Sequence, residues 1–214
     1  MRDETLTPEL VLQAYRAGVF PMSEARDSDE IFWVDPLQRG VLPLDGFHIS
    51  RSLARRLRRA EYHVTFDTCF TDVVAGCAAR EETWINETIF DLYATLHARG
   101  DAHSCEVWRG DVLVGGVYGV AIAGAFFGES MFSTAPDASK VGLAYLTHHL
   151  VTCGFVLFDT QFITDHLATL GAIEIDRQDY HAMLHEALGV AAKFDAQRAC
   201  PTPQDLLQRN TQTS

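Results

Sequence analysis

The sequence predicts an α+β fold, in which a small N-terminal α+β domain precedes a larger domain of antiparallel strands, a helix and a further strand. Three observations lead to this prediction. A capped helix and short strand-like runs open the chain, consecutive strand-like runs occupy residues 104–127, and a long helix-like run precedes an apolar strand at 155–158. We place the domains at residues 1–62 and 63–192, followed by a polar tail over 193–214 that we expect to be loosely held.

The N-terminal helix has clear boundary signals. Thr7 can cap it, Pro8 suits its first turn, and Gly18 can end it. The segments that follow are an irregular acidic stretch over 20–30 and strand candidates at 31–34 and 40–44.

An arginine-rich helix is expected next. Ile49, Leu53 and Leu57 share one side of this helix. The opposite arc, about 100° wide, carries the four arginines Arg51, Arg55, Arg58 and Arg59. Two interpretations stay open: a solvated helix face that neutralises nearby acids, or a local contact for phosphates. The net charge of −12 argues against a general nucleic-acid coat protein.

The remaining elements follow from apolar periodicity and turn residues. Strand candidates lie at 62–66, 104–109, 112–120, 122–127, 155–160 and 172–175. Helix candidates are 70–79, a helix capped by Asn86 and ended by Gly100, a helix that Asp137 can cap and Gly154 can end, 165–170 and 177–188. We expect Gly128–Ser133 to be a loop that carries one carboxylate and two hydroxyls.

Composition and motifs exclude several classes of protein. The five cysteines form an odd set without a CxxC pair, and no apolar run could span a bilayer, which favours a reduced, cytoplasmic protein that does not enter a membrane. No HExxH motif is present, so we expect no metal. Ser130 does not lie in a GxSxG motif, so a Ser-His-Asp hydrolase is disfavoured.

Three strands, a helix and a further strand suggest an N-acetyltransferase-like (GNAT-like) core for the second domain. Domains of this kind that use coenzyme A present a glycine-rich turn to its pyrophosphate where the helix begins. Here that turn, residues 133–138, has no glycine and carries Asp137. We therefore expect no coenzyme A and no other cofactor.

Polar residues at strand ends mark the candidate site. Asp159 and Gln161 have the same parity, so on a regular strand both side chains face the same side. A carboxylate beside an amide can hold an amine, or it can merely satisfy the polar end of a buried strand. Glu129 is likewise either a site residue or an ion-pair partner. Lys140 opposes the helix dipole in the first turn of its helix, and Trp84 has the setting of a site or surface aromatic.

Ten ordered blocks carry a family resemblance. They are AYRAGVFPM (14–22), FWVDPLQRGVLPL (32–44), FHISRSL (47–53), TWI (83–85), HSCEVWRG (103–110), LVGGVYGV (113–120), GESMFS (128–133), DASK (137–140), DTQ (159–161) and TDHLATLGAIEIDRQDY (164–180). In this order they resemble the leucyl/phenylalanyl-tRNA–protein transferase family over residues 7–188.

The resemblance implies an enzyme that takes leucine or phenylalanine, less often methionine, from aminoacyl-tRNA. It passes that residue to the α-amino group of proteins beginning with Arg or Lys and so creates an N-degron. By analogy, Asp159 and Gln161 assist the attacking amine, with Glu129 and Ser130 beside them. The residues expected to bind the adenosine and aminoacyl groups are Trp84, Tyr93, Phe126, Met22 and Trp33. The tRNA-binding residues would be Arg51, Arg55, Arg58, Arg59 and Lys140, and the enzyme would be a monomer.

This chemistry makes modest demands on an enzyme. The ester is already activated, so proximity, a deprotonated amine and oxyanion support suffice. Two residues depart from the family pattern: Met22 stands where many members have Trp, and Thr134 stands where Arg is usual. Rival interpretations are a module that binds tRNA ends or protein N-termini without catalysis, and a transferase with another acceptor. We expect Asp159→Ala to lower turnover with little loss of fold.

Overall fold

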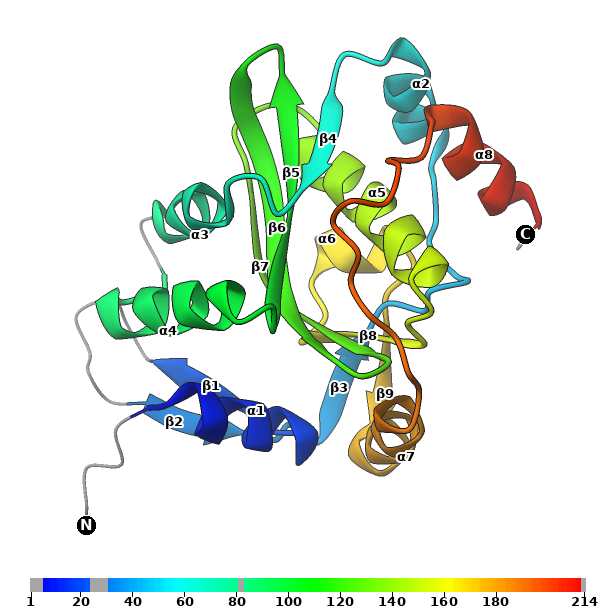
Figure 1. Cartoon of the computed structure of the whole chain (residues 1–214). Helices are drawn as coiled ribbons and strands as arrows, with labels where there is room; N and C mark the ends of the chain where they lie inside the picture. Colours follow the sequence, from blue (N-terminus) through cyan, green and yellow to red (C-terminus); the bar gives the residue numbers. More distant parts are fainter. Residues whose placement is uncertain (1–5, 24–30, 81–82, 213–214) are drawn as a thin grey trace.

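The computed structural model describes residues 6–23, 31–80 and 83–212, with side chains through residue 208 (Figure 1). Its helices are α1 (Pro8–Arg16), α2 (Arg51–Arg59), α3 (Phe70–Ala78), α4 (Glu87–Ala98), α5 (Ala138–Thr152), α6 (Asp165–Ala168), α7 (Arg177–Leu188) and α8 (Pro203–Gln212). Its strands are β1 (Phe20–Ser23), β2 (Ile31–Val34), β3 (Gln38–Val41), β4 (His63–Phe66), β5 (Ala102–Arg109), β6 (Val112–Ile122), β7 (Ala125–Ser133), β8 (Leu157–Gln161) and β9 (Ile173–Asp176).

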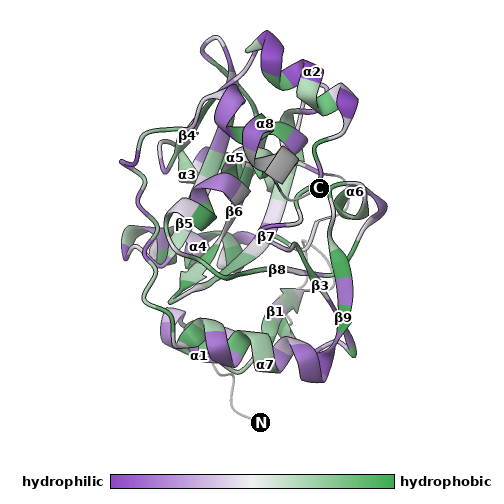
Figure 2. Cartoon of the chain, turned by 90° about the vertical axis from the view of Figure 1, so that its right-hand side faces the viewer, coloured by the Kyte–Doolittle hydropathy of each residue, from purple (hydrophilic) through white to green (hydrophobic). Residues whose placement is uncertain are grey.

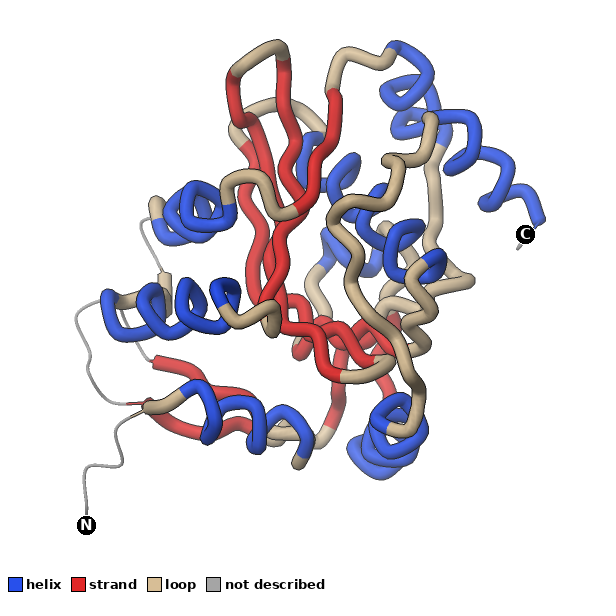
Figure 3. Tube along the Cα trace, viewed as in Figure 1, coloured by secondary structure: helices blue, strands red, loops and turns tan. Residues whose placement is uncertain are grey.

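A mixed seven-stranded sheet forms the centre of the molecule, and Figure 3 shows its strands in red. The strand order is β4-β5-β6-β7-β8-β3-β9. Every neighbouring pair is antiparallel except β7 and β8, which are parallel and are joined by the crossover helix α5. β1 and β2 form a separate antiparallel pair.

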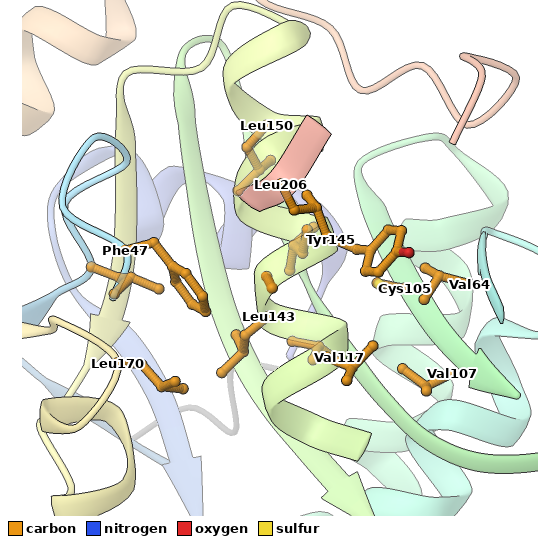
Figure 4. Packing of buried hydrophobic residues seen from close by; sticks show 14 of the residues in the cluster. Phe47, Val64, Cys105, Val107, Val117, Leu143, Tyr145, Leu150, Leu170 and Leu206 are labelled. Atoms are coloured by element: carbon orange, nitrogen blue, oxygen red, sulfur yellow. The ribbon is translucent and has the colours of Figure 1, made fainter. Parts of the chain in front are cut away.

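Helices cover both faces of this sheet. In Figure 1, α3 and α4 lie on one side of the long strands β5–β7 and α5 lies on the other. Because successive strand residues face opposite sides, Val117 joins the apolar cluster under α5 and Tyr118 joins the cluster under α3 and α4. Figure 4 shows the first cluster, where Leu143 of α5 points toward Phe47 and Leu170 and Leu150 of α5 lies beside Leu206.

The parallel strands β7 and β8 separate after a short contact. They pair only over residues 125–127 and 157–159, although β7 continues to Ser133. β8 ends at Gln161, whose φ of 64° lies in the left-handed region. β3 closes on the far side of β8, and a Cβ on Gly40 would lie 2.6 Å from the carbonyl carbon of Phe162. β7 and β8 therefore diverge beyond residues 127 and 159, and we call the region between the diverging strands the wedge.

The helix signals at the N-terminus and around residue 86 are confirmed. The Thr7 hydroxyl accepts a hydrogen bond from the Leu10 N–H at 3.2 Å, and the Asn86 side chain accepts one from the Ile89 N–H at 2.8 Å. The arginine-rich helix is also present as α2, with Ser50 as its cap.

The prediction of a loop at residues 128–133 is wrong. This segment is the second half of β7, paired with β6 from Tyr118 back to Gly115. Polar side chains do not prevent strand formation here, because the neighbouring strand satisfies the backbone N–H and C=O groups.

Asp137 does not cap α5 through its side chain. Its φ is 63°, and its carboxylate instead pairs with Lys140 Nζ at 3.5 Å and Arg56 Nε at 3.6 Å. These pairs explain why a lysine is tolerated in the first turn of α5, where the helix dipole disfavours it.

The C-terminal segment is packed rather than loosely held. Phe194 and Leu206 are buried in the cluster under α5, and α8 packs against α2 and α5. The polar composition of this segment concealed the few apolar side chains that anchor it.

The N-terminal strands differ from the prediction in two respects. β1 (Phe20–Ser23) was assigned to an irregular stretch, and β3 covers residues 38–41 rather than 40–44; residues 24–30 lie outside the described part of the chain. β3 belongs to the large sheet although it precedes residue 62. The division into domains at residue 62 stays a prediction.

Candidate active site

Glu129 occupies an irregular position in β7 where the wedge begins. Tyr118 pairs with Ser130 and Gly119 with Gly128, so Glu129 is an extra residue on its strand, as in a β-bulge. A bulge re-aims a side chain relative to its neighbours. Glu129 is 8% exposed, and its carboxylate faces groups from three other elements.

Three donors hold the Glu129 carboxylate. Its Oε1 accepts hydrogen bonds from the Tyr15 hydroxyl at 2.6 Å and from Gln161 Nε2 at 3.1 Å. Its Oε2 accepts one from the Tyr93 hydroxyl at 2.6 Å. The network thus joins α1, α4, β7 and β8 around one carboxyl group.

Burial governs the protonation of this network. It raises the pKa of Glu129 to about 7, although the three hydrogen bonds oppose the shift. Burial also raises the pKa of Tyr15 and of Tyr93 well above 10, so both hydroxyls stay protonated as donors. A carboxyl group that changes charge near neutral pH inside a network is a candidate acid or base.

A second carboxylate, Asp159, is completely buried in β8 and pairs with Arg39 of β3. Arg39 Nε donates to Oδ1 at 3.0 Å and Nη2 donates to Oδ2 at 2.6 Å. The Tyr180 hydroxyl also donates to Oδ2 at 2.6 Å. The Arg39 guanidinium lies 4.5 Å from the ring centre of Phe20 and 4.3 Å from that of Tyr180.

Gln161 links the two carboxylates. Its backbone N–H donates to Asp159 Oδ1 at 2.7 Å, and its side chain donates to Glu129. The left-handed conformation of Gln161 interrupts the strand alternation, so the predicted same-side arrangement of Asp159 and Gln161 does not describe their contact. The structure nevertheless brings Asp159, Gln161 and Glu129 into one connected network.

The buried position of Asp159 also changes one expectation. Removing the carboxylate would leave the Arg39 guanidinium buried without its charged partner, which costs several kcal/mol. Contrary to the expectation from the sequence, we therefore expect Asp159→Ala to destabilise the fold.

The predicted substrate-binding residues lie on both faces of the sheet. Tyr93 belongs to the Glu129 network, and Trp84 packs edge-to-face against it at 6.4 Å between ring centres. Met22 packs against the apolar cluster under α3 and α4, which contains Tyr93. Phe126 lies in the other cluster, under α5, 5.4 Å from the ring centre of Phe158. Tyr15 and Tyr93, which hold Glu129, both belong to the cluster under α3 and α4.

Trp33 and Ser130 complete the predicted substrate-binding set. Trp33 of β2 is 40% exposed and pairs with Pro21 of β1. Ser130 is adjacent to Glu129, and its hydroxyl contacts the buried Cys77 thiol.

The predicted tRNA-binding arginines of α2 are exposed, namely Arg51, Arg55, Arg58 and Arg59. Arg59 lies 3.6 Å from Glu61, whereas the other three form no ion pair with any residue that the structure describes. Figure 2 shows α2 as a largely hydrophilic helix beside α8. A groove of about 810 Å³ between them is lined by Arg58, Gln204 and Leu207, among others. Lys140, in the first turn of α5, pairs with Asp137, which also pairs with Arg56 of α2.

Comparisons with known proteins place this arrangement in a family. A model described as "Leucyl/phenylalanyl-tRNA protein transferase" matches residues 41–185, and one for the N-terminal domain of the same transferase matches residues 4–37. A leucyl/phenylalanyl-tRNA–protein transferase of Cereibacter sphaeroides is 59% identical over 214 residues and covers 100% of both chains. The chain belongs to the leucyl/phenylalanyl-tRNA–protein transferase family.

Other matches agree with this assignment. A transferase of the same name from a Ruegeria species is 60% identical over 210 residues, covering 98% of this chain and 100% of the relative. The crystal structure of FemX is similar with a TM-score of 0.51 at 10% identity, over 78% of this chain and 66% of that chain. The FemX likeness concerns the fold alone, and the N-acetyltransferase-like class stays a prediction.

Three residues of the network were not predicted as site residues: Tyr15, Arg39 and Tyr180. All three lie within blocks that resemble the transferase family, so their positions were visible. Their roles were not, because each contacts its partner across more than 20 positions of sequence.

Within the described ranges, no group of three or more His, Cys, Asp or Glu side chains is arranged to hold a metal ion. The helices in that part of the chain are also too short or too polar to cross a membrane.

Proposed function

We propose that this transferase moves leucine or phenylalanine, and less often methionine, from aminoacyl-tRNA to the α-amino group of proteins beginning with Arg or Lys. One observation carries the proposal: the Glu129 carboxyl, with a pKa of about 7, is joined to Gln161 at the mouth of the wedge. Peptide-bond formation needs a neutral amine held against an ester carbonyl. Glu129 would remove the proton from the ammonium group, and Gln161 would hold the resulting amine in place.

Gln161 would orient the amine. Its Nε2 is committed to Glu129, so its carbonyl oxygen is the group left to accept a hydrogen bond from the amine N–H. An α-ammonium group has a pKa of about 7.7–8.0. Because this value lies close to that of Glu129, the carboxylate can take the ammonium proton at little cost.

The bond changes then balance without a further reagent. The amine nitrogen attacks the ester carbonyl carbon, the new C–N bond forms, and the ester C–O bond to the terminal ribose breaks. The proton lost by the amine ends on the ribose hydroxyl. Holding the reactants in this geometry supplies most of the acceleration that an activated ester requires.

Asp159 would act as a positioning residue. Its two oxygens already accept hydrogen bonds from Arg39, Tyr180 and the Gln161 N–H, and it is completely buried. In this proposal Asp159 fixes the conformation of Gln161 and does not touch the amine.

The remaining contacts would bind the two substrates. Trp84 and Tyr93 would contact the terminal adenosine, and Phe126 would line an apolar site for the transferred side chain. Met22 and Trp33 would contact the adenosine or the aminoacyl group. Such a site distinguishes one methylene by only about 1–3 kcal/mol, which fits several apolar donors. The α2 arginines would contact phosphates of the acceptor stem, with Lys140 nearby. We further propose that the enzyme acts as a cytoplasmic monomer.

A labelling experiment tests the proposal. The protein is incubated with radiolabelled leucyl-tRNA or phenylalanyl-tRNA and with peptides that begin with Arg, Lys, Asp or Ala. Label on the Arg and Lys peptides alone is the expected result. Label on the Asp peptide would identify a different acceptor specificity, and no label on any peptide would favour a binding module without catalysis.

A further inference from the structure

A groove at the free edge of β7 begins two residues beyond Glu129. It has a volume of about 570 Å³ and runs between α3, β7, the start of α5 and α6. Residues 131–133 of β7 and Thr134 just beyond it form one wall, and Thr164 and His166 also line the groove. β8 would fill this space if it continued beside β7, but it turns away at Gln161.

The backbone of β7 directs toward this groove groups that the β6 ladder does not use. The Thr134 N–H donates to the Val114 carbonyl at 2.8 Å, so residue 134 faces β6. In an antiparallel ladder, alternate residues face the partner strand, and Met131 and Ser133 therefore direct their N–H and C=O groups to the edge. The Arg80 side chain donates to the Met131 carbonyl, which confirms that direction.

We propose that this edge binds the backbone of the acceptor polypeptide as an added parallel strand. The inference rests on the proposed function, because it places the acceptor amine at Glu129 and Gln161. A chain that leaves this point along β7 runs in the direction of β8, parallel to β7. Backbone hydrogen bonds recognise any sequence after the first residue, as in other cases of strand addition.

The lining of the groove fits a peptide better than RNA. Among the described lining residues, the only cationic candidates are Arg80 and His166. The Arg80 guanidinium already donates to a backbone carbonyl, and burial together with nearby Lys140 lowers the pKa of His166. Thr134 donates its hydroxyl to the Val114 carbonyl and adds no charge. Phosphate groups would need more positive charge than this.

A backbone N-methyl series tests the added strand. Peptides that begin with Arg carry a single N-methyl group at position 2, 3, 4 or 5, and transfer is measured with saturating aminoacyl-tRNA. We expect KM for the peptide to rise about threefold to tenfold at alternate positions, because each methyl group removes one hydrogen bond. Equal KM values for all methylated peptides would overturn the proposal. Label on the unmethylated peptide shows separately that transfer itself occurs.

A matched pair of variants tests the enzyme side. Ser133→Pro removes the edge N–H, which the β6 ladder does not use, and Ser133→Ala removes only the hydroxyl. Ser133→Pro should raise KM for the peptide about threefold to tenfold, with Tm and KM for aminoacyl-tRNA unchanged, and Ser133→Ala should not raise it. A higher KM for aminoacyl-tRNA instead would assign the groove to RNA and refute the proposal. If Ser133→Pro does not fold, the peptide series decides.

Discussion

The buried pair of Arg39 and Asp159 supports a quantitative prediction. Arg39 is 1% exposed and Asp159 is 0% exposed, and Arg39 supplies hydrogen bonds to both carboxylate oxygens. Arg39→Met removes them and leaves a buried carboxylate with only Tyr180 and the Gln161 N–H as donors. Breaking such a pair costs about 3–5 kcal/mol, a large part of the stability of a typical domain.

The assay is equilibrium urea unfolding followed by tryptophan fluorescence. Arg39→Met and Asp159→Asn should each lower the free energy of unfolding. The double variant should lose at least about 2 kcal/mol less than the sum of the two, because the residues act as one unit. Arg51→Met is the control, since this exposed arginine has no described ion pair and its loss should change stability by less than about 0.5 kcal/mol. Additive effects of the two core substitutions would refute the reasoning.

Four further predictions concern Glu129, α2 and the adenosine contact. Burial raises the pKa of Glu129 from 4.5 in the unfolded chain to about 7 in the folded protein. Its contribution to stability is therefore complete below pH 4.5 and is lost as the pH rises through 7. The lost stability is about 3 kcal/mol, and Glu129→Gln should abolish this pH dependence in urea unfolding at pH 5–8. In transfer assays Glu129→Gln should lower kcat about 100-fold or more, and an unchanged kcat would exclude it as the proton acceptor. The double substitution Arg55→Glu and Arg58→Glu should raise KM for aminoacyl-tRNA and flatten its salt dependence, whereas the control Arg16→Glu on α1 should do neither. An equal salt dependence of KM in the double variant and the unsubstituted protein would show that α2 does not contact the RNA. Trp84→Ala should raise KM for aminoacyl-tRNA by the 1–3 kcal/mol, or roughly 5- to 150-fold, of one stacked base, with the peptide KM unchanged.

Local signals predicted much of the fold. The Thr7 and Asn86 caps, the opposite faces of α2 and the apolar run of β8 each depend on residues close in sequence. The prediction for residues 128–133 was wrong because polar side chains were taken to indicate a loop. In the structure, pairing with β6 overrides that preference.

The candidate site was predicted in part. Glu129, Gln161 and Asp159 were expected to lie near one another, and one network connects them. The direction of each side chain could not be predicted, because it depends on an irregularity in β7 and on a left-handed residue at the end of β8. Arg39 was overlooked because its partner, Asp159, is 120 residues away in the sequence.

The sequence by itself determined the family, most helices and strands, and the three polar residues of the candidate site. Those features are encoded by motifs, apolar periodicity and capping residues that act over a few positions. Only the tertiary structure decided that Asp159 is buried against Arg39, that two tyrosines and Gln161 hold Glu129, and that the edge of β7 stays open. The reason is physical: charge burial, side-chain direction and strand pairing depend on partners that the fold brings together from distant parts of the chain.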